Sequence, residues 1–171
     1  MTKIYAGIGS RSLTLEERSF CKKVGRWLAK KGWKLQTGAA KGTDQAFANG
    51  ALSYKGDVKL CLPSPSYEYK WVELAKAKGA DTKLLQYWHV DAWESVDKHH
   101  PKPWLLTNWT RSLQARNYLI VEGVKFVIAW PKGKWGGGTA QGIRIAEALG
   151  ITVINLSIPE KLENIKNKIE Y

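Results

Sequence analysis

The sequence has few cysteines and no long hydrophobic run. Its 171 residues include two cysteines, Cys21 and Cys61, and their number and spacing argue against a disulfide scaffold or a zinc site, which needs a fuller set of ligands. No stretch of about 18 consecutive apolar residues is present, as a membrane-spanning helix would require, and the start MTKIYAGIGS is too short and polar for a signal peptide. These absences predict a cytoplasmic protein with no membrane partner and with both thiols reduced in its core.

Acidic residues are also scarce. Fifteen Asp and Glu stand against 27 Lys and Arg, which gives a formal net charge of +12 and an isoelectric point near 9.7. A surface this positive attracts polyanions and favours a nucleic acid or a nucleotide-rich partner; the alternative is that lysine-rich helices serve only solubility. The nine tryptophans also allow two interpretations. Exposed rings beside cations stack on bases, whereas buried rings pack in a core or an interface.

What is present is an alternation of strand and helix patterns. Short apolar runs at 3–8, 33–36, 58–63, 125–130 and 151–156 are typical of buried strands, and segments at 14–31, 43–53, 69–79, 110–123, 140–150 and 159–171 are typical of helices. The first helix opens with a capping box of Thr14 and Glu17. Strands that alternate with helices form a parallel sheet. We therefore predict one α/β domain over 1–171, with a doubly wound, mainly parallel, Rossmann-like sheet of about five strands and flanking helices.

Residues 82–110 interrupt this alternation. The segment contains four tryptophans and all three histidines, with little regular period beyond one short helix at 91–99. A lid or binding loop over the sheet is one interpretation, and plain packing of the tryptophans is the other. His89, His99 and His100 are candidate ligands or acid–base groups, but their spacing is poor for a metal site. We expect no metal.

The stretch Trp33–Asp44, WKLQTGAAKGTD, is the centre of the predicted site. An apolar run ends in a loop of small residues, after which Thr43 and Asp44 are placed to cap the N-terminus of the next helix. Such a turn leaves backbone N–H groups free at the positive end of a helix dipole, and small side chains let a phosphate or carboxylate approach them. Lys41 adds a positive charge at the same place.

Two further loops have the same character. Gly7–Arg11, Thr37–Asp44 and Trp130–Thr139 each follow the carboxyl end of a predicted strand, so all three lie at one edge of a parallel sheet, where ligands bind in open α/β folds. Each brings a cation: Arg11, Lys41, or Lys132 with Lys134. The three loops together predict a phosphate-binding pocket. Neither the P-loop nor the dinucleotide fingerprint is matched, so we expect no cofactor.

The order of four motifs adds a resemblance. GIGSR (7–11), TGAAKGTDQAF (37–47), ARN (115–117) and GGGTAQGI (136–143) resemble the Rossmann-like domain of the DNA-processing protein A (Smf) family, within the SMF/LOG superfamily, over roughly residues 3–62 and 110–156. The resemblance implies binding of single-stranded DNA, help in loading a recombinase, and a homodimer. With the physical analysis of the loops it gives this ligand-binding set: Gly9, Ser10, Arg11, Gly38, Lys41, Gly42, Thr43, Asp44, Arg116, Asn117, Gly136, Gly137, Gly138 and Thr139.

The chemistry of these residues agrees with a phosphate ligand. Arg11 and Arg116 are able to pair phosphates bidentately, and Asp44 either caps its helix or meets a sugar hydroxyl. The sequence shows no winged-helix or SAM-like extension, which departs from the DNA-processing family and is what we expect of a phage or mobile-element protein. The tryptophans of residues 82–110 would then supply base stacking.

An enzymatic alternative comes from the LOG branch, which resembles this chain through GGGT and hydrolyses the N-glycosidic bond of nucleoside monophosphates. The acidic residue expected three places after Thr139 is Gly142 here, and Glu147 faces elsewhere on its helix. Asp44 and Glu122 remain the candidate catalytic carboxylates for a hydrolase or a deoxyribosyltransferase. The leading hypothesis is non-catalytic binding of single-stranded DNA or a nucleotide; a receptor or sponge for a small nucleotide signal is a third.

Overall fold

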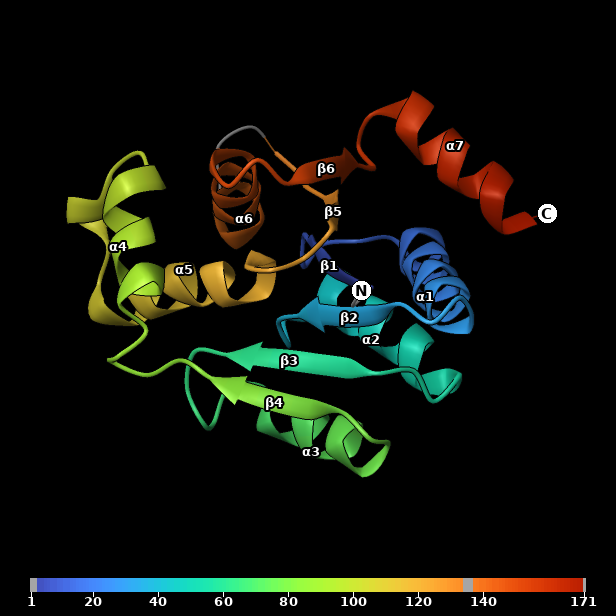
Figure 1. Ribbon diagram of the computed structural model, residues 1–171, viewed down its shortest axis with the longest axis horizontal. Helices are drawn as coiled ribbons and strands as arrows, with labels where there is room; N and C mark the ends of the chain where they lie inside the picture. The colour runs from blue at the N-terminus through green and yellow to red at the C-terminus, as the bar shows by residue number, and fades with distance from the viewer. Residues whose placement is uncertain (1–2, 134–136, 171) are drawn as a thin grey trace.

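The computed structural model describes residues 3–133 and 137–170, and its centre is a parallel sheet (Figure 1). The strands lie in the order β4-β3-β2-β1-β5-β6, and every neighbouring pair is parallel. Their bounds are β1 Ile4–Gly9, β2 Lys34–Thr37, β3 Val58–Leu62, β4 Asp81–Leu84, β5 Phe126–Trp130 and β6 Thr152–Asn155. The fold is therefore α/β and Rossmann-like, as predicted.

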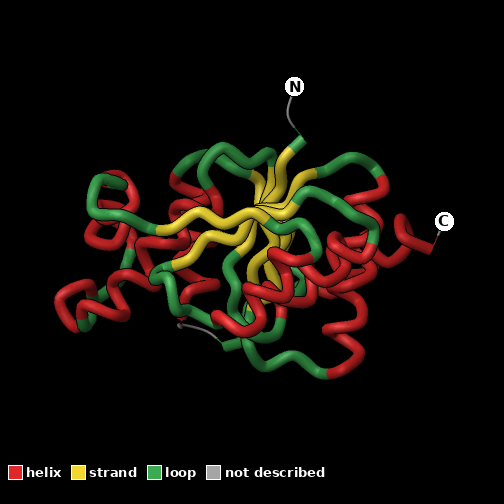
Figure 2. The backbone as a smooth tube through the Cα atoms, turned by 90° about the horizontal axis from the view of Figure 1, so that it is seen from below, coloured by secondary structure: helices red, strands yellow, loops and turns green. Residues whose placement is uncertain are grey.

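Helices cover both faces of this sheet, as Figure 2 shows. One layer holds α1 Leu15–Lys30, α2 Thr43–Ser53, α3 Tyr69–Ala77 and α7 Pro159–Glu170; the other holds α4 Val90–His99, α5 Asn108–Val121 and α6 Gly137–Ala148, with a short 3₁₀ turn at Pro103–Leu105. Side chains alternate between the two cores along each strand: Tyr5 packs toward α1 and α2, and Ala6 packs toward α5.

The strand order reverses between β1 and β5. The chain runs from β1 outward through β2, β3 and β4, then returns to place β5 on the other side of β1. Gly9 and Trp130 are partners at the carboxyl ends of these two strands, and the Ser10 N–H donates to the Trp130 carbonyl at 2.9 Å. A ligand site of an open α/β sheet forms at this point, because the loops after β1 and β5 diverge there.

Two expectations about local structure need correction. Residues 82–84, assigned to the excursion, belong to β4, so the sheet has six strands; β4 is a short edge strand with charged residues and carries no apolar run. Thr43 and Asp44 do not cap α2, because the N-cap is Gly42 at φ 87°, with no side-chain cap hydrogen bond. The Thr14–Glu17 capping box of α1 is confirmed.

None of the helices within 3–133 and 137–170 has both the length and the apolar character needed to cross a bilayer.

Candidate functional site

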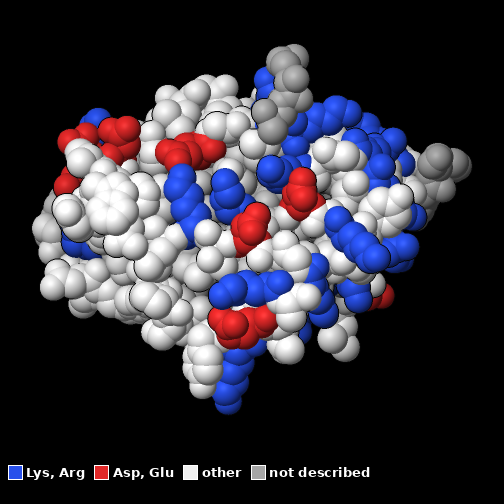
Figure 3. Space-filling view, turned by 60° about the horizontal axis from the view of Figure 1, so that its bottom comes forward, with Lys and Arg blue, Asp and Glu red and all other residues white. Residues whose placement is uncertain are grey.

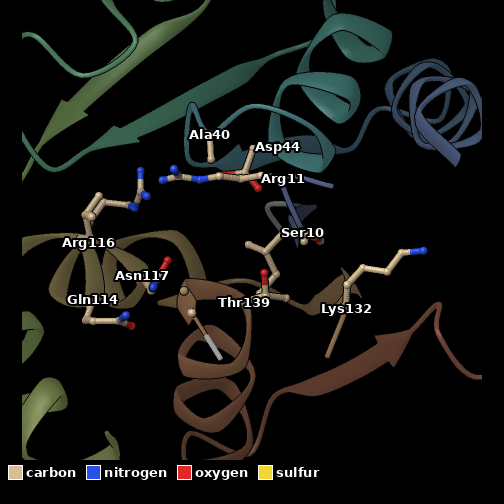
Figure 4. Close-up of a pocket in the computed structure, with 14 residues that line it drawn as sticks. Ser10, Arg11, Ala40, Asp44, Gln114, Arg116, Asn117, Lys132 and Thr139 are labelled. Atoms are coloured by element: carbon tan, nitrogen blue, oxygen red, sulfur yellow. The ribbon is translucent and has the colours of Figure 1, made fainter. Parts of the chain in front are cut away.

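A cavity of about 290 Å³ opens at the carboxyl edge of β1, β2 and β5 (Figure 4). The loops after these strands form one side of it, and α5 with the start of α6 forms the other. The residues that line it are Ile8, Gly9, Ser10, Arg11, Ala40, Asp44, Leu113, Gln114, Arg116, Asn117, Lys132, Gly137, Gly138 and Thr139. The structure thus brings together most of the residues that the sequence predicted, at the predicted edge of the sheet.

Asp44 and Arg116 form the floor of the cavity. Each is only 5% exposed, and Arg116 Nη1 donates to the Cys61 carbonyl at 3.0 Å, which fixes the guanidinium beneath the loop after β2. Gly38 leaves room for both groups, since a Cβ there would lie 2.6 Å from Asp44 Oδ2 and 2.7 Å from Arg116 Nη1. Gly38 therefore shapes the site but does not line it.

Burial changes the acid–base chemistry of Asp44. Loss of solvent raises the pKa of its carboxyl from the ordinary value of 3.8 to about 6, against the opposing effects of the Arg116 charge, the backbone N–H groups of Ala40 and Gly9, and Arg11. A carboxyl that titrates near pH 6 is able to donate or accept a proton near neutrality. Asp44 is therefore the one predicted carboxylate that combines a shifted pKa with a place in the cavity.

Tyr67 connects the two arginines of the site. Arg11 Nη2 donates to the Tyr67 hydroxyl at 3.1 Å, and the Arg116 guanidinium carbon lies 5.1 Å from the centre of the Tyr67 ring. Figure 4 shows the guanidinium ends of Arg11 and Arg116 close together at one end of the cavity. Two adjacent cations on one aromatic support provide a bidentate site for a phosphate.

α5 places unpartnered polar atoms against the cavity. Gln114 Oε1, Arg116 Nε and Asn117 Nδ2 are buried and have no hydrogen-bond partner within 3–133 and 137–170. A buried polar atom left unpaired costs about 1–3 kcal/mol. Three such atoms within one turn of the same helix indicate that a ligand or water completes their hydrogen bonds when the cavity is filled.

The N-terminus of α6 meets the same cavity. Gly137, Gly138 and Thr139 form its first turn, and a Cβ at Gly138 would lie 3.1 Å from Asn117 Nδ2, a close contact that glycine avoids. The free N–H groups and the positive dipole end of a helix attract anions. Two members of the predicted loop, Gly136 and Lys134, lie outside the described residues.

Three other predicted residues do not line the cavity, and two of them shape the neighbouring loop. Thr43 Oγ1 donates to the Ser10 carbonyl at 2.8 Å, and Gly42 packs against the backbone of Ser10 and Arg11. These contacts join the loops after β1 and β2. Lys41 is exposed and is absent from the cavity lining.

One of the two predicted cations of the third loop, Lys132, forms an ion pair. Lys132 lines the rim, yet its Nζ lies 2.6 Å from Glu17 Oε2, and its side chain points away from the other labelled residues in Figure 4. The ion pair and the Thr14 N–H lower the pKa of Glu17 against the effect of partial burial. Arg11 and Arg116 are therefore the main cations of the site.

Glu122 lies elsewhere. It is the C-cap residue of α5, pairs with Lys83 Nζ at 3.0 Å, and lines a separate hollow beside Trp88 and Tyr118. The structure does not bring the candidate carboxylate Glu122 to the cavity that Asp44 lines, because α5 presents residues 113, 114, 116 and 117 to the cavity and Glu122 lies beyond the end of the helix.

The three histidines do not reach the cavity either. His89 Nδ1 accepts from the Gln86 N–H at 2.8 Å, and His100 Nδ1 accepts from the Lys102 N–H at 3.1 Å, so both stabilise local turns. Among the described residues no three His, Cys, Asp or Glu side chains are grouped as a metal ion would need.

Sequence reasoning missed several residues of the site. Leu113 and Gln114 lie four and three residues before Asn117 on α5, and this helical spacing would have indicated them. Tyr67 follows β3, whose carboxyl end lies at the same edge of the sheet. The loop after β3 could therefore have been expected near the site, although no sequence pattern in it identifies Tyr67 as the residue that contacts the arginines.

Comparisons with known proteins agree with this fold. No protein-family model matches the chain, and no curated protein sequence matches it. Among solved structures, DNA processing protein A from Streptococcus pneumoniae superposes with a TM-score of 0.64 at 20% identity over 98% of this chain and 55% of that one. The Helicobacter pylori protein of the same name, described for its single-stranded DNA binding mode, gives 0.67 at 18% identity over 99% and 79%.

A molybdenum cofactor carrier protein from Chlamydomonas reinhardtii is also similar, with a TM-score of 0.59 at 15% identity over 98% of this chain and 84% of the carrier. These likenesses confirm the predicted DNA-processing-A-like, Rossmann-like fold. The chain spans about half the length of the Streptococcus protein.

Proposed function

We propose that the cavity binds the phosphate group of a nucleotide, free or within single-stranded DNA, and that the protein holds this ligand without transforming it. The observation that carries the proposal is the row of buried, unpartnered polar atoms on α5 that faces a cavity with two arginines and a helix N-terminus. A ligand with anionic oxygens satisfies all three features.

The size of the cavity limits the ligand. About 290 Å³ lies just below the range of about 300–1,000 Å³ for small-molecule sites, so the cavity has room for no more than one nucleotide unit. A longer strand has to continue over the surface. The solved structure of the Helicobacter protein supports single-stranded DNA as the polymer. The predicted homodimer, single domain and recombinase-loading role stay predictions; light scattering would test the first.

The test is a titration of wild-type protein and Arg11→Met with a nucleoside monophosphate and with a short single-stranded oligonucleotide at two salt concentrations. Arg11 is exposed, so the variant is expected to fold. Loss of a charge-assisted contact of about 1.5–3 kcal/mol predicts a roughly 10- to 150-fold loss of affinity for both ligands. Lys78→Met, which removes an exposed cation from the C-cap of α3, is the matched control.

The salt response separates the two forms of the ligand. Affinity for a polymer that touches several phosphates falls steeply with salt, whereas affinity for a single nucleotide falls little. Equal affinities of wild-type protein and Arg11→Met for both ligands would contradict the proposed site.

A second function, N-glycoside hydrolysis or deoxyribosyl transfer, is favoured by one observation: Asp44 lines the cavity with a pKa of about 6. Release of free base from a bound nucleotide, detected by mass spectrometry and abolished in Asp44→Asn but not in Glu122→Gln, would establish it. No release from wild-type protein would leave the binding function.

A further inference from the structure

An aromatic pair stands next to the two arginines. The ring of Tyr67 lies 6.2 Å from that of Trp109 at an interplanar angle of 52°, while the other partners of Tyr67 are Arg11 and Arg116. Tyr67 thus has a phosphate-binding cation at its hydroxyl, another against its ring and an indole beside it. This group links the cavity to the surface.

Trp109 has a free face. It lies in the first turn of α5 and is 47% exposed, and it precedes Leu113, which lines the cavity, by four residues, so both lie on the same side of the helix. Arg116 and Asn117 follow one turn further. α5 therefore presents, in order, an exposed indole, an apolar side chain and the polar end of the site.

A hydrogen bond holds Tyr67 in place. Arg11 Nη2 donates to its hydroxyl, and its ring lies beside Arg116 and Trp109. The next residue, Glu68, has a left-handed backbone conformation at φ 48° and is the N-cap of α3.

Other exposed tryptophans differ from Trp109 in their surroundings. Trp88 contacts Tyr87 and His89, and Trp104 lies in the 3₁₀ turn; both are more exposed than Trp109. Neither has a ring contact with Tyr67 among the described residues, whereas Trp109 does, and Tyr67 in turn contacts both arginines.

From these contacts we infer that Trp109 is the stacking site for the aromatic base of the nucleotide whose phosphate occupies the cavity, with Tyr67 as the residue that positions it. This inference rests on the proposed function and narrows it: the ligand is a phosphate that carries a planar base, and a phosphorylated sugar alone binds more weakly. Stacking of one base on an aromatic side chain contributes about 1–3 kcal/mol, which corresponds to roughly a 5- to 150-fold change in affinity.

The experiment compares a thymidine pentanucleotide with an abasic pentanucleotide of the same phosphate number. Wild-type protein should bind the base-bearing strand about 5- to 150-fold more tightly. Trp109→Leu should lose that preference while keeping its affinity for the abasic strand, and Trp109→Phe, which retains an aromatic face, should restore part of it. Trp88→Leu and Trp104→Leu are the matched controls and should behave as wild type.

The outcomes separate the two proposals. If wild-type protein and Trp109→Leu prefer the base-bearing strand equally, or if Trp104→Leu loses the preference as fully as Trp109→Leu does, the stacking site is wrong and the phosphate site stands. If wild-type protein binds neither strand and no nucleoside monophosphate, the proposed function fails and the stacking site fails with it.

Discussion

At the scale of single residues, the buried pair of Asp44 and Arg116 defines the chemistry of the site. Each side chain is only 5% exposed, and Gly38 is needed for both to fit. A free arginine would draw any anion, but under the proposed function a carboxyl beside it would accept hydrogen bonds from sugar hydroxyls and would favour phosphates that carry such groups.

The shifted pKa of Asp44 predicts a pH dependence of stability. Because the folded-state pKa of about 6 lies above the ordinary value of 3.8, the neutral carboxyl favours folding. Its contribution is fully present below about pH 4 and is lost as the pH rises toward 6. The Asp44→Asn variant has no carboxyl to ionise at this position. The unfolding free energy of the variant minus that of wild type should therefore rise by on the order of 2–3 kcal/mol between about pH 4 and pH 6.

Urea denaturation of the two proteins at pH 4, 5, 6 and 7 measures this difference, because all other titrating groups are common to both. Two parallel profiles would show that Asp44 titrates normally in the folded protein.

At the scale of elements, the sequence revealed the parts of the site that are local. The three loops could be predicted because each follows an apolar strand and is rich in small residues, and parallel strands bring their carboxyl ends to one edge. β4 was not predicted because this edge strand, with the sequence DTKL, has no buried residues and therefore no apolar pattern in its sequence. Arg11 and Tyr67 are 56 residues apart and Lys132 and Glu17 are 115 apart; such pairings follow from topology, which no local pattern encodes.

The crossing of α1 and α2 holds the first two loops together and depends on glycine. A Cβ at Gly50 would overlap the Lys22 carbonyl oxygen and would lie 3.0 Å from the Arg26 nitrogen. Gly50→Ala should lower the unfolding free energy by about 2 kcal/mol or more, despite the better helix propensity of alanine. Asn49→Ala, at the exposed neighbouring position, should change it by less than about 0.5 kcal/mol. Chemical denaturation measures both, and equal stabilities would refute this packing.

At the scale of the whole molecule, positive charge is unevenly distributed. Lys and Arg gather on the right of the face shown in Figure 3, the side on which α1 lies in Figure 1. α1 itself exposes Arg18, Lys22, Lys23, Arg26 and Lys30, whereas α4, at the other end, carries Asp91, Glu94 and Asp97. A basic side of this kind raises the rate at which a polyanion arrives.

This basic side and the cavity are alternative places for a phosphate. The α1 cations are exposed to water, which weakens each contact, whereas Arg116 is buried and already oriented by the Cys61 carbonyl. Buried, oriented donors bind an anion more strongly than solvated ones. The cavity should therefore hold the phosphate, and the α1 side should only attract it.

The most direct test is a crystal structure of the protein with a nucleoside monophosphate. The account predicts phosphate density between Arg11, Arg116 and the first turn of α6, with the base against Trp109. Phosphate bound only along α1, with the cavity unoccupied at saturating ligand, would contradict it.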